Sequence, residues 1–430
     1  MPLKRLLHPH LSRIGCVALT LATVSFGQTP SDSPLTLQVA LARASELNPR
    51  LAALGYAQTA SEALIEQAGQ RPSPTVALSA DDLLGTGDYT GLGRSQTTLQ
   101  LSQTLERGGK REKRIHLASH EREAAAAEFV VQRTDVLAAT ALAYTACLAA
   151  EKRLVLAEDA VKQARELLAA LTTRVHSGAG SPTETARARS ALVAAQADLA
   201  RAQAAAASTR ATLATYWNGT DTELAPLIGE LRIPASLPDA TLALDQLGQN
   251  PRIALQQARI ASQRSTLQVA KSQTAVDVTA SGGLRYYRED SDGALVLGVS
   301  VPLPMRNYNQ GNIRAARASL AGAEQTLVAI KAELRAQLAA AWQELKTAHL
   351  TVLTLNRDAR PATEEALALV RRGYAQGEIP LTEVFEAQRA QSVLSREILD
   401  AEWAYAAALV RFEALTNSTY PLTSALLSPR

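Results

Sequence analysis

The chain alternates apolar and polar side chains in two short segments near its middle. In residues 276–286 and 295–303 nearly every second side chain is apolar, and a weaker alternation of similar length occurs at 75–83 and 94–105. Successive side chains of a β-strand point to opposite faces, so the pattern predicts four strands with one apolar and one polar face. Strands of about 9–11 residues can cross a membrane. A soluble hairpin with one buried face would show the same alternation.

Elsewhere the apolar spacing changes from two to seven. The heptad positions, with a four-residue shift in the middle, are Leu320, Leu327, Leu334, Leu338, Leu345 and Val352. Such a shift locally unwinds a supercoil toward straight helices. We predict long helices at 110–175 and 312–373, each followed by a turn rich in Gly and Pro and by a second helix, at 182–217 and 381–416. The first would be roughly 100 Å long, which favours coiled packing over an ordinary solvated bundle.

The order of elements occurs twice. Asn-Pro-Arg-Leu at 48–51 returns as Asn-Pro-Arg-Ile at 250–253, and Gly178 matches Gly377 further along. A sustained offset indicates a tandem repeat. The predicted organisation is a leader (1–27), a first repeat (34–220, with a helix, strands within 75–105 and a helical hairpin at 110–217), a linker (221–239), a second repeat (240–419, with a helix, strands within 276–305 and a hairpin at 312–416) and a tail (420–430).

The first 27 residues are typical of a secretory signal peptide. Three basic residues precede an uncharged apolar run, and small residues end it just before Gln28, where we expect cleavage without lipidation. Cleavage removes three of the 44 basic residues and none of the 41 acidic ones, so the mature chain is neutral. Nucleic acid is therefore a poor partner. Only Cys147 follows the leader, which excludes an intrachain disulfide.

Catalytic and metal-binding patterns are weak. His116 and His120 are four apart and share a helix face with Glu112, but zinc requires three or four well-placed ligands and a solvated polar face explains the pair equally well. No Ser-His-Asp or Cys-His arrangement and no phosphate-binding glycine loop stands out. We predict a protein that is not an enzyme and that has no cofactor or resident metal.

Four strands pose a problem of closure. Four strands cannot form a barrel, and an open edge cannot lie in lipid because its backbone groups would have no hydrogen-bond partners. If the strands cross a membrane, several copies of the chain must combine them.

Two segments carry a family resemblance: "VPLPMRNYNQGNIRAA" (301–316) and "LNRDARPATEEALALVRRGYAQGEIPLTEVFEAQRA" (355–390). With the duplication, they resemble the outer-membrane factor (TolC) family of tripartite efflux pumps, and most closely its CzcC-like heavy-metal branch. The resemblance implies a mainly α protein with a membrane β-barrel. Each chain of a homotrimer would give four strands to a 12-stranded barrel that continues as a coiled-coil periplasmic tunnel. The chain would be a passive export duct in the outer membrane of a Gram-negative bacterium, working with a periplasmic adaptor and an inner-membrane pump.

The resemblance also assigns roles to residues near the second helical turn. Glu383 and Glu386 would form an acidic ring at the periplasmic gate. Glu184 would accept a hydrogen bond from Tyr374 and hold that end closed. Some relatives have a basic residue where this chain has Ile379, so an ionic latch there is not expected. An alternative for the two gate glutamates is a helix start, where carboxylates interact favourably with the helix dipole.

Other positions mark the ends of the predicted tunnel. Gly178 and Gly377 would lie at the hairpin tips, where the adaptor would dock, and turn formation alone also explains them. Pro302, Pro304 and Gly311 would mark the step from barrel wall to tunnel wall.

Two other functions compete with a metal export duct. A periplasmic coiled-coil adaptor or scaffold would share long helical hairpins, but would carry one hairpin between β-rich halves instead of two hairpins with strands between them. The same duct could instead serve drug efflux or type I secretion, because the pump selects the cargo.

Overall fold

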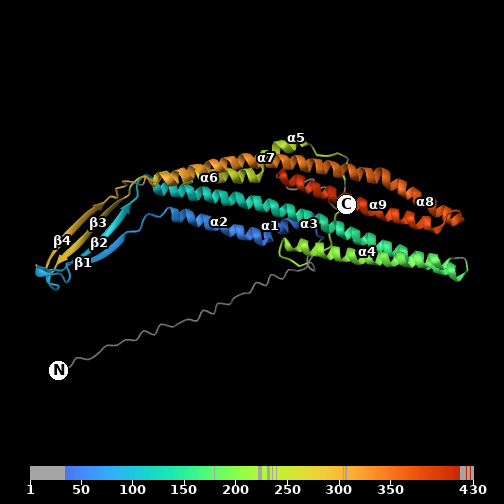
Figure 1. Ribbon diagram of the computed structural model, residues 1–430, viewed down its shortest axis with the longest axis horizontal. Coiled ribbons are helices and arrows are strands. Elements are labelled where there is room, and N and C mark those ends of the chain that lie inside the picture. The colour runs from blue at the N-terminus through green and yellow to red at the C-terminus, as the bar shows by residue number, and fades with distance from the viewer. Residues whose placement is uncertain are drawn as a thin grey trace, which may run out of the picture.

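The computed structural model describes residues 34–430 except 179, 221–224, 230–232, 235, 239, 304, 306–307, 417–422, 424–426 and 428–430. The predicted leader (1–27) lies outside the described residues, as does most of the predicted tail. The described chain is elongated, with a small sheet at one end and helices that run lengthwise to the other end (Figure 1). We call the helical end, where α3 turns into α4 and α8 into α9, the tip.

Each repeat consists of short helices, two strands and a helical hairpin. The first repeat contains α1 (Leu37–Leu47), α2 (Pro49–Ala68), β1 (Thr75–Asp81), the 3-10 turn η1 (Gly87–Tyr89), β2 (Gln96–Leu105), α3 (Lys110–His176) and α4 (Pro182–Thr215). The second contains α5 (Ala240–Gln246), the 3-10 turn η3 (Leu247–Gln249), α6 (Pro251–Ser272), β3 (Val278–Tyr287), β4 (Asp292–Ser300), α7 (Gln310–Thr354), the π-helical segment η4 (Leu355–Ala359), α8 (Arg360–Gln376) and α9 (Leu381–Leu415). The predicted tandem-repeat, mainly helical fold is confirmed.

The sheet is antiparallel, in the order β1-β2-β3-β4, so β1 and β4 are its edges. One row of paired residues across it is Leu78, Leu99, Leu284 and Leu295, and the adjacent row is Ser79, Thr98, Arg285 and Ala294. The four leucines are each more than half exposed. The sheet therefore has one polar face and one apolar face, and no described part of the chain covers the apolar one, as the alternation predicts.

The main core lies about halfway along the helices. Its largest fully buried side chains include Tyr144 of α3, Leu345 of α7 and Tyr405 of α9. The heptad positions Leu334, Leu338, Leu345 and Val352 are buried, which confirms that this spacing identifies the inner face of α7. Every described helix falls short of the combined length and apolar character that a membrane-crossing helix needs.

The long helix of the second repeat is not continuous. The sequence pattern predicts one helix over 312–373, whereas the structure interrupts it with the π-helical segment η4. Pro361 follows this segment and lies in the first turn of α8. Proline lacks an N–H, and its ring clashes with the carbonyl four residues earlier, here that of Arg357. A π-helical turn absorbs this conflict inside a helix.

The repeated Asn-Pro motif connects the start of one helix to the end of another. The Oδ1 atom of Asn250 accepts a hydrogen bond from the Arg252 backbone N–H at 3.0 Å, and its Nδ2 donates to the Leu415 carbonyl at 2.9 Å. Asn48 makes the equivalent bonds to the Arg50 N–H and the Tyr216 carbonyl. In the first repeat the motif thus caps α2 and fastens it to the end of α4, and in the second repeat it caps α6 and fastens it to the end of α9.

Candidate functional site

The tip turns depend on glycine at equivalent positions. Gly178 and Gly377 have φ angles of +76° and +78°, the left-handed region that side chains disfavour. Gly377 caps α8, and its N–H donates to the Tyr374 carbonyl at 3.1 Å. A Cβ atom on either glycine would meet no atom within 4 Å, so both turns are open to solvent in the single chain. The structure thus places the two predicted docking glycines at neighbouring hairpin ends (Figure 1).

A small apolar cluster holds the two hairpins together near the tip. Its buried members come from α3, α4 and α9, and the half-buried Tyr374 of α8 packs against them. The buried members are Leu171, Ala188, Leu381 and Val384. This cluster is separate from the main core, so the tip has its own packing between the repeats.

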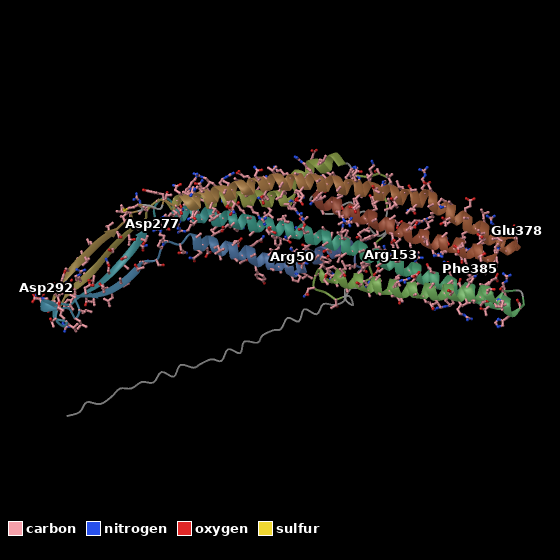
Figure 2. All side chains as sticks on the ribbon, in the orientation of Figure 1. Arg50, Arg153, Asp277, Asp292, Glu378 and Phe385 are labelled. Atoms are coloured by element: carbon pink, nitrogen blue, oxygen red, sulfur yellow. The ribbon has the colours of Figure 1, made fainter. Side chains whose placement is uncertain are left out.

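Glu383 and Glu386 lie on the exposed side of that cluster. Both are in the first turns of α9 and are exposed, whereas Val384 between them is buried. Residues three apart lie on one helix face, so the two carboxylates are neighbours in solvent. Neither carboxylate has an ion-pair partner within 4.0 Å among the described residues. Figure 2 labels Glu378 and Phe385 at this same end.

Tyr374 contacts Arg174, which the sequence did not identify. An Arg174 guanidinium N–H donates a hydrogen bond to the Tyr374 hydroxyl, and the guanidinium carbon lies 5.4 Å from the ring centroid. Within the described part of the chain, no hydrogen bond joins Glu184 to Tyr374. Ile379 packs against Gly373 so closely that a Cβ there would lie 2.5 Å from it. Arg174 of the first repeat therefore places a positive charge at Tyr374, although this chain has the uncharged Ile379 where some relatives have a basic residue.

One feature of the sequence could have identified Arg174. It lies four residues before Gly178, and Tyr374 lies three residues before Gly377. Because the two glycines end equivalent helices, these residues must lie at similar heights on neighbouring hairpins. Arg174 could be identified in this way only if equivalent positions of the two repeats are taken to lie at the same level along the helices.

The other end of the helices meets the sheet at a junction that includes two of the predicted marker residues. Pro302 lies between the end of β4 and the start of α7, and Gly311 lies in the first turn of α7; Pro304 is outside the described residues. Asn309 begins α7 with a φ of +57°, and its Nδ2 donates to the Ala270 carbonyl at 2.7 Å. This bond fastens the start of α7 to the end of α6, beside the sheet.

Two ion pairs reinforce this junction, and one of them joins the two repeats. Lys110, which is buried, lies 2.8 Å from Asp277, and Arg114 pairs with Glu106. The hydrogen bond from Arg114 lowers the pKa of Glu106 below its ordinary value. Burial alone would raise the pKa of Asp277, but hydrogen bonds from Lys110 and the Arg107 backbone N–H outweigh it and lower that pKa. Figure 2 labels Asp277 at this junction.

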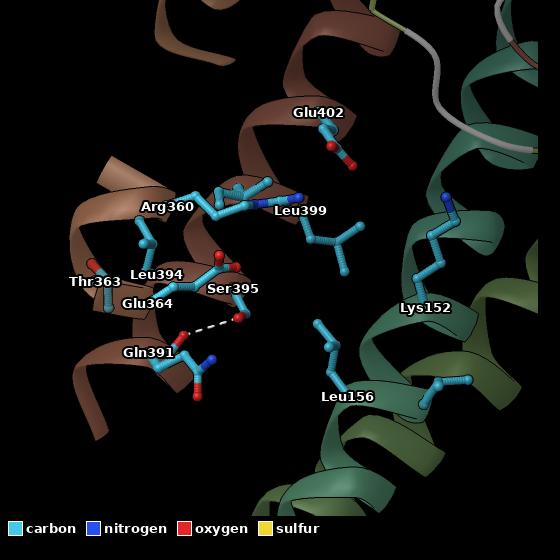
Figure 3. A pocket seen from close by; sticks show the side chains of 12 residues that line it. Lys152, Leu156, Arg360, Thr363, Glu364, Gln391, Leu394, Ser395, Leu399 and Glu402 are labelled. Carbon is cyan, nitrogen blue, oxygen red and sulfur yellow. Dashed lines mark hydrogen bonds between the residues drawn. The ribbon is translucent and has the colours of Figure 1, made fainter. Parts of the chain in front are cut away.

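A cavity of about 410 Å³ lies between α3 and the α8–α9 hairpin. Figure 3 shows Lys152 of α3 across the cavity from Arg360, Glu364 and Glu402 of that hairpin. Burial raises the pKa of Glu402, and the nearby Lys152 and Arg360 charges partly oppose that rise. The cavity adjoins the π-helical segment and has charges of both signs, so its lining selects no ligand class.

The histidine pair does not form a metal centre with neighbouring groups. The His116 Nε2 lies 3.7 Å from Glu112, whereas the His120 Nδ1 lies 2.8 Å from the Ser265 hydroxyl. Across the described ranges, no three His, Cys, Asp or Glu side chains are grouped so that they could hold a metal ion.

Comparisons with known proteins match nearly the whole chain. The family model described as "Outer membrane efflux protein" matches residues 40–219 and 242–418. The cobalt-zinc-cadmium resistance protein CzcC of Cupriavidus metallidurans is 29% identical over 356 residues, which are 83% of this chain and 84% of CzcC. The nickel-cobalt-cadmium resistance protein NccC of Alcaligenes xylosoxydans xylosoxydans is 26% identical over 75% of this chain and 72% of NccC.

Solved structures show the same fold. A structure of CusC, described as forming a transmembrane channel, superposes with a TM-score of 0.74 at 15% sequence identity. The superposition covers 88% of this chain and 91% of CusC.

Proposed function

The chain belongs to the outer membrane efflux protein family, and on this premise we propose that it exports divalent heavy-metal cations as the outer-membrane duct of a tripartite efflux system. Members of this family are passive channels and not enzymes, and they extend from the outer membrane into the periplasm. The two hairpins with strands between them, and the family itself, exclude the alternative of a periplasmic adaptor.

The observation that carries the metal assignment is the likeness to CzcC over 83% of the chain. CzcC and NccC are both named for resistance to cobalt and cadmium, with zinc or nickel as a third metal. The cargo we propose is therefore this group of divalent cations.

The exposed sheet supports a trimeric duct. Its apolar face suits lipid and its polar face suits a water-filled lumen. The open edges β1 and β4 need partners in a membrane, which neighbouring copies of the chain would supply. From the family resemblance, three copies with four strands each would form a 12-stranded barrel above a helical tunnel.

The tip supports a cation-selective gate. Threefold symmetry would place six carboxylates, from Glu383 and Glu386 of each copy, around one axis. Carboxylate rings attract cations, and neither glutamate is neutralised within the described chain. We assign the closed-state contact to Tyr374 with Arg174 in place of Glu184. An adaptor would dock around Gly178 and Gly377, whose turns are open, and would connect the duct to the inner-membrane pump.

Metal resistance in a bacterium tests this proposal. The host should retain a metal-exporting inner-membrane pump and adaptor of this system but lack its own duct. Expression of the chain should restore growth in cobalt or cadmium and lower the metal content of the cells. A chain that reaches the outer membrane but restores only drug resistance would contradict the cargo. A chain that does not fractionate with the outer membrane would contradict the duct.

A further inference from the structure

We propose that the junction between sheet and helices is a basic collar that binds anionic phospholipid headgroups of the inner leaflet of the outer membrane. The inference rests on the proposed function for its placement of the sheet in that membrane. It adds a binding surface, with a lipid as its ligand, at the end of the helices opposite the gate.

An exposed basic side chain lies in or directly beside each of the four connections between helices and strands. Arg71 lies between α2 and β1, Lys271 lies in the last turn of α6 before β3, and Arg314 lies in the first turns of α7 after β4. At the connection from β2 to α3 there are two, Arg107 in the loop and Arg111 in the first turn of α3. We call these five residues the basic collar. If three copies assemble around one axis, twelve such connections would surround the duct at one level.

The collar charges are not neutralised by the chain itself. Of the acidic residues at the junction, Glu106 pairs with Arg114 and Asp277 pairs with Lys110, and neither of these basic partners belongs to the collar. Glu112 lies near His116. Among the described residues, no collar side chain has an ion pair within 4.0 Å. Arg111 donates one hydrogen bond to the Gly69 carbonyl at 2.5 Å, but this neutral partner leaves its charge uncompensated. Five exposed positive charges therefore remain for an external anion.

Exposed apolar side chains connect the collar to the apolar face of the sheet. Leu297 and Val299 of β4 are each 74% exposed on that face. The alternation continues past the strand to Val301 and Leu303, which are 47% and 79% exposed. Toward the helices, the surface thus changes from apolar strand to apolar loop to basic collar. Hydrocarbon, interface and headgroup phosphates follow one another in the same order in a leaflet.

The other end of the sheet has the opposite charge. Its loops and strand ends carry six acidic residues and two basic ones. The acidic residues are Asp81, Asp82, Asp88, Glu289, Asp290 and Asp292. Of the two basic residues there, Arg94 is paired with Asp88 and Glu289. A free basic collar is therefore specific to the helical side, which in the proposed duct faces the periplasm and meets the phospholipid leaflet.

Lipid retention by the purified full-length protein tests the collar. Native mass spectrometry would count phosphatidylglycerol or phosphatidylcholine molecules that stay bound to the detergent-solubilised trimer. Arg71, Arg107, Arg111, Lys271 and Arg314 would each be changed to Gln in one variant. The matched control changes five exposed arginines nearer the tip to Gln, namely Arg165, Arg187, Arg189, Arg371 and Arg372.

We expect the wild type and the control to retain phosphatidylglycerol in preference to phosphatidylcholine. In the collar variant the ratio of retained phosphatidylglycerol to phosphatidylcholine should fall about tenfold, because basic residues near an anionic surface each strengthen binding several-fold. Equal retention by the collar variant, or an equal loss in the control, would overturn the inference. A wild-type protein that is not trimeric would instead contradict the proposed duct, so the two failures can be told apart.

A fluorescence experiment places the apolar loop independently of any loss of charge. In liposomes with lipids brominated near the headgroup, the tryptophan fluorescence of Leu303→Trp should be quenched more than that of the wild type, which has three native tryptophans. Leu350→Trp, at an exposed position far along α7, should not be. Equal quenching of both variants, or of neither, would show that the junction does not lie at the lipid interface.

Discussion

Arg174 of α3 donates a hydrogen bond to the hydroxyl of Tyr374 of α8, and its guanidinium also lies over the tyrosine ring. The two residues belong to different repeats and lie within one turn of the tip glycines. The contact therefore connects the two hairpins at the end where the proposed duct must open.

Removal of this contact should make the closed duct leakier. Tyr374→Phe keeps the ring under the guanidinium and loses only the hydrogen bond, whereas Arg174→Ala loses both interactions. We expect single-channel conductance in planar bilayers to rise in both variants, and to rise more in Arg174→Ala. Glu184→Gln is the control and should conduct like the wild type. A rise in Glu184→Gln alone would restore the glutamate as the partner of Tyr374.

The junction ion pairs should make stability depend on acidic pH. The pKa values of Glu106 and Asp277 are lowered in the folded chain from ordinary values of 4.5 and 3.8. Their contribution is therefore complete above those values and is lost as the pH falls through the lowered ones. The midpoint temperature of thermal unfolding, followed by circular dichroism, should therefore decrease as the pH is lowered below these ordinary values.

Two variants check the assignment of that pH dependence. Asp277→Asn leaves the buried Lys110 without its partner and should cost about 2–3 kcal/mol of folding free energy at neutral pH. Glu106→Gln should cost less, because Arg114 is more exposed than Lys110. If the unfolding midpoint depends on pH below 4 as strongly in the Glu106→Gln/Asp277→Asn double variant as in the wild type, other carboxylates cause that dependence.

The Asn-Pro motif should be worth more than an ordinary helix cap. Asn250→Ala removes the cap of α6 and also the bond to the Leu415 carbonyl, at a site that is almost fully buried. We expect a loss of about 2 kcal/mol in the free energy of unfolding. Thr36→Ala, which removes only an exposed cap on α1, should cost about 1 kcal/mol or less. Equal losses would show that the second bond adds nothing.

Local periodicity predicted most of the fold. The two-residue alternation identified the faces of the strands, and the seven-residue spacing identified the buried side of α7. Both are local consequences of backbone geometry. The π-helical interruption was missed because the heptad pattern continues to Val352, next to it, although Pro361 was a visible signal.

The candidate site was harder to predict than the fold. The family resemblance supplied Tyr374 and the two gate glutamates, but not Arg174, because that contact depends on how two hairpins from different repeats lie side by side. The collar was missed for a similar reason. Its residues are scattered from 71 to 314 in the sequence, and only the fold brings the four connections to one level.

Selectivity in planar bilayers tests the central claim, that divalent cations pass an acidic gate at the tip. The wild type would be compared with Glu383→Gln/Glu386→Gln, and with a control that neutralises two exposed glutamates of α3, Glu158→Gln/Glu166→Gln. We predict that the wild type and the control prefer cations and are blocked by divalent ions from the tip side. The gate variant should lose the block and much of the preference. A gate variant that conducts, selects and is blocked like the wild type would contradict the account and leave these glutamates as helix-start residues only.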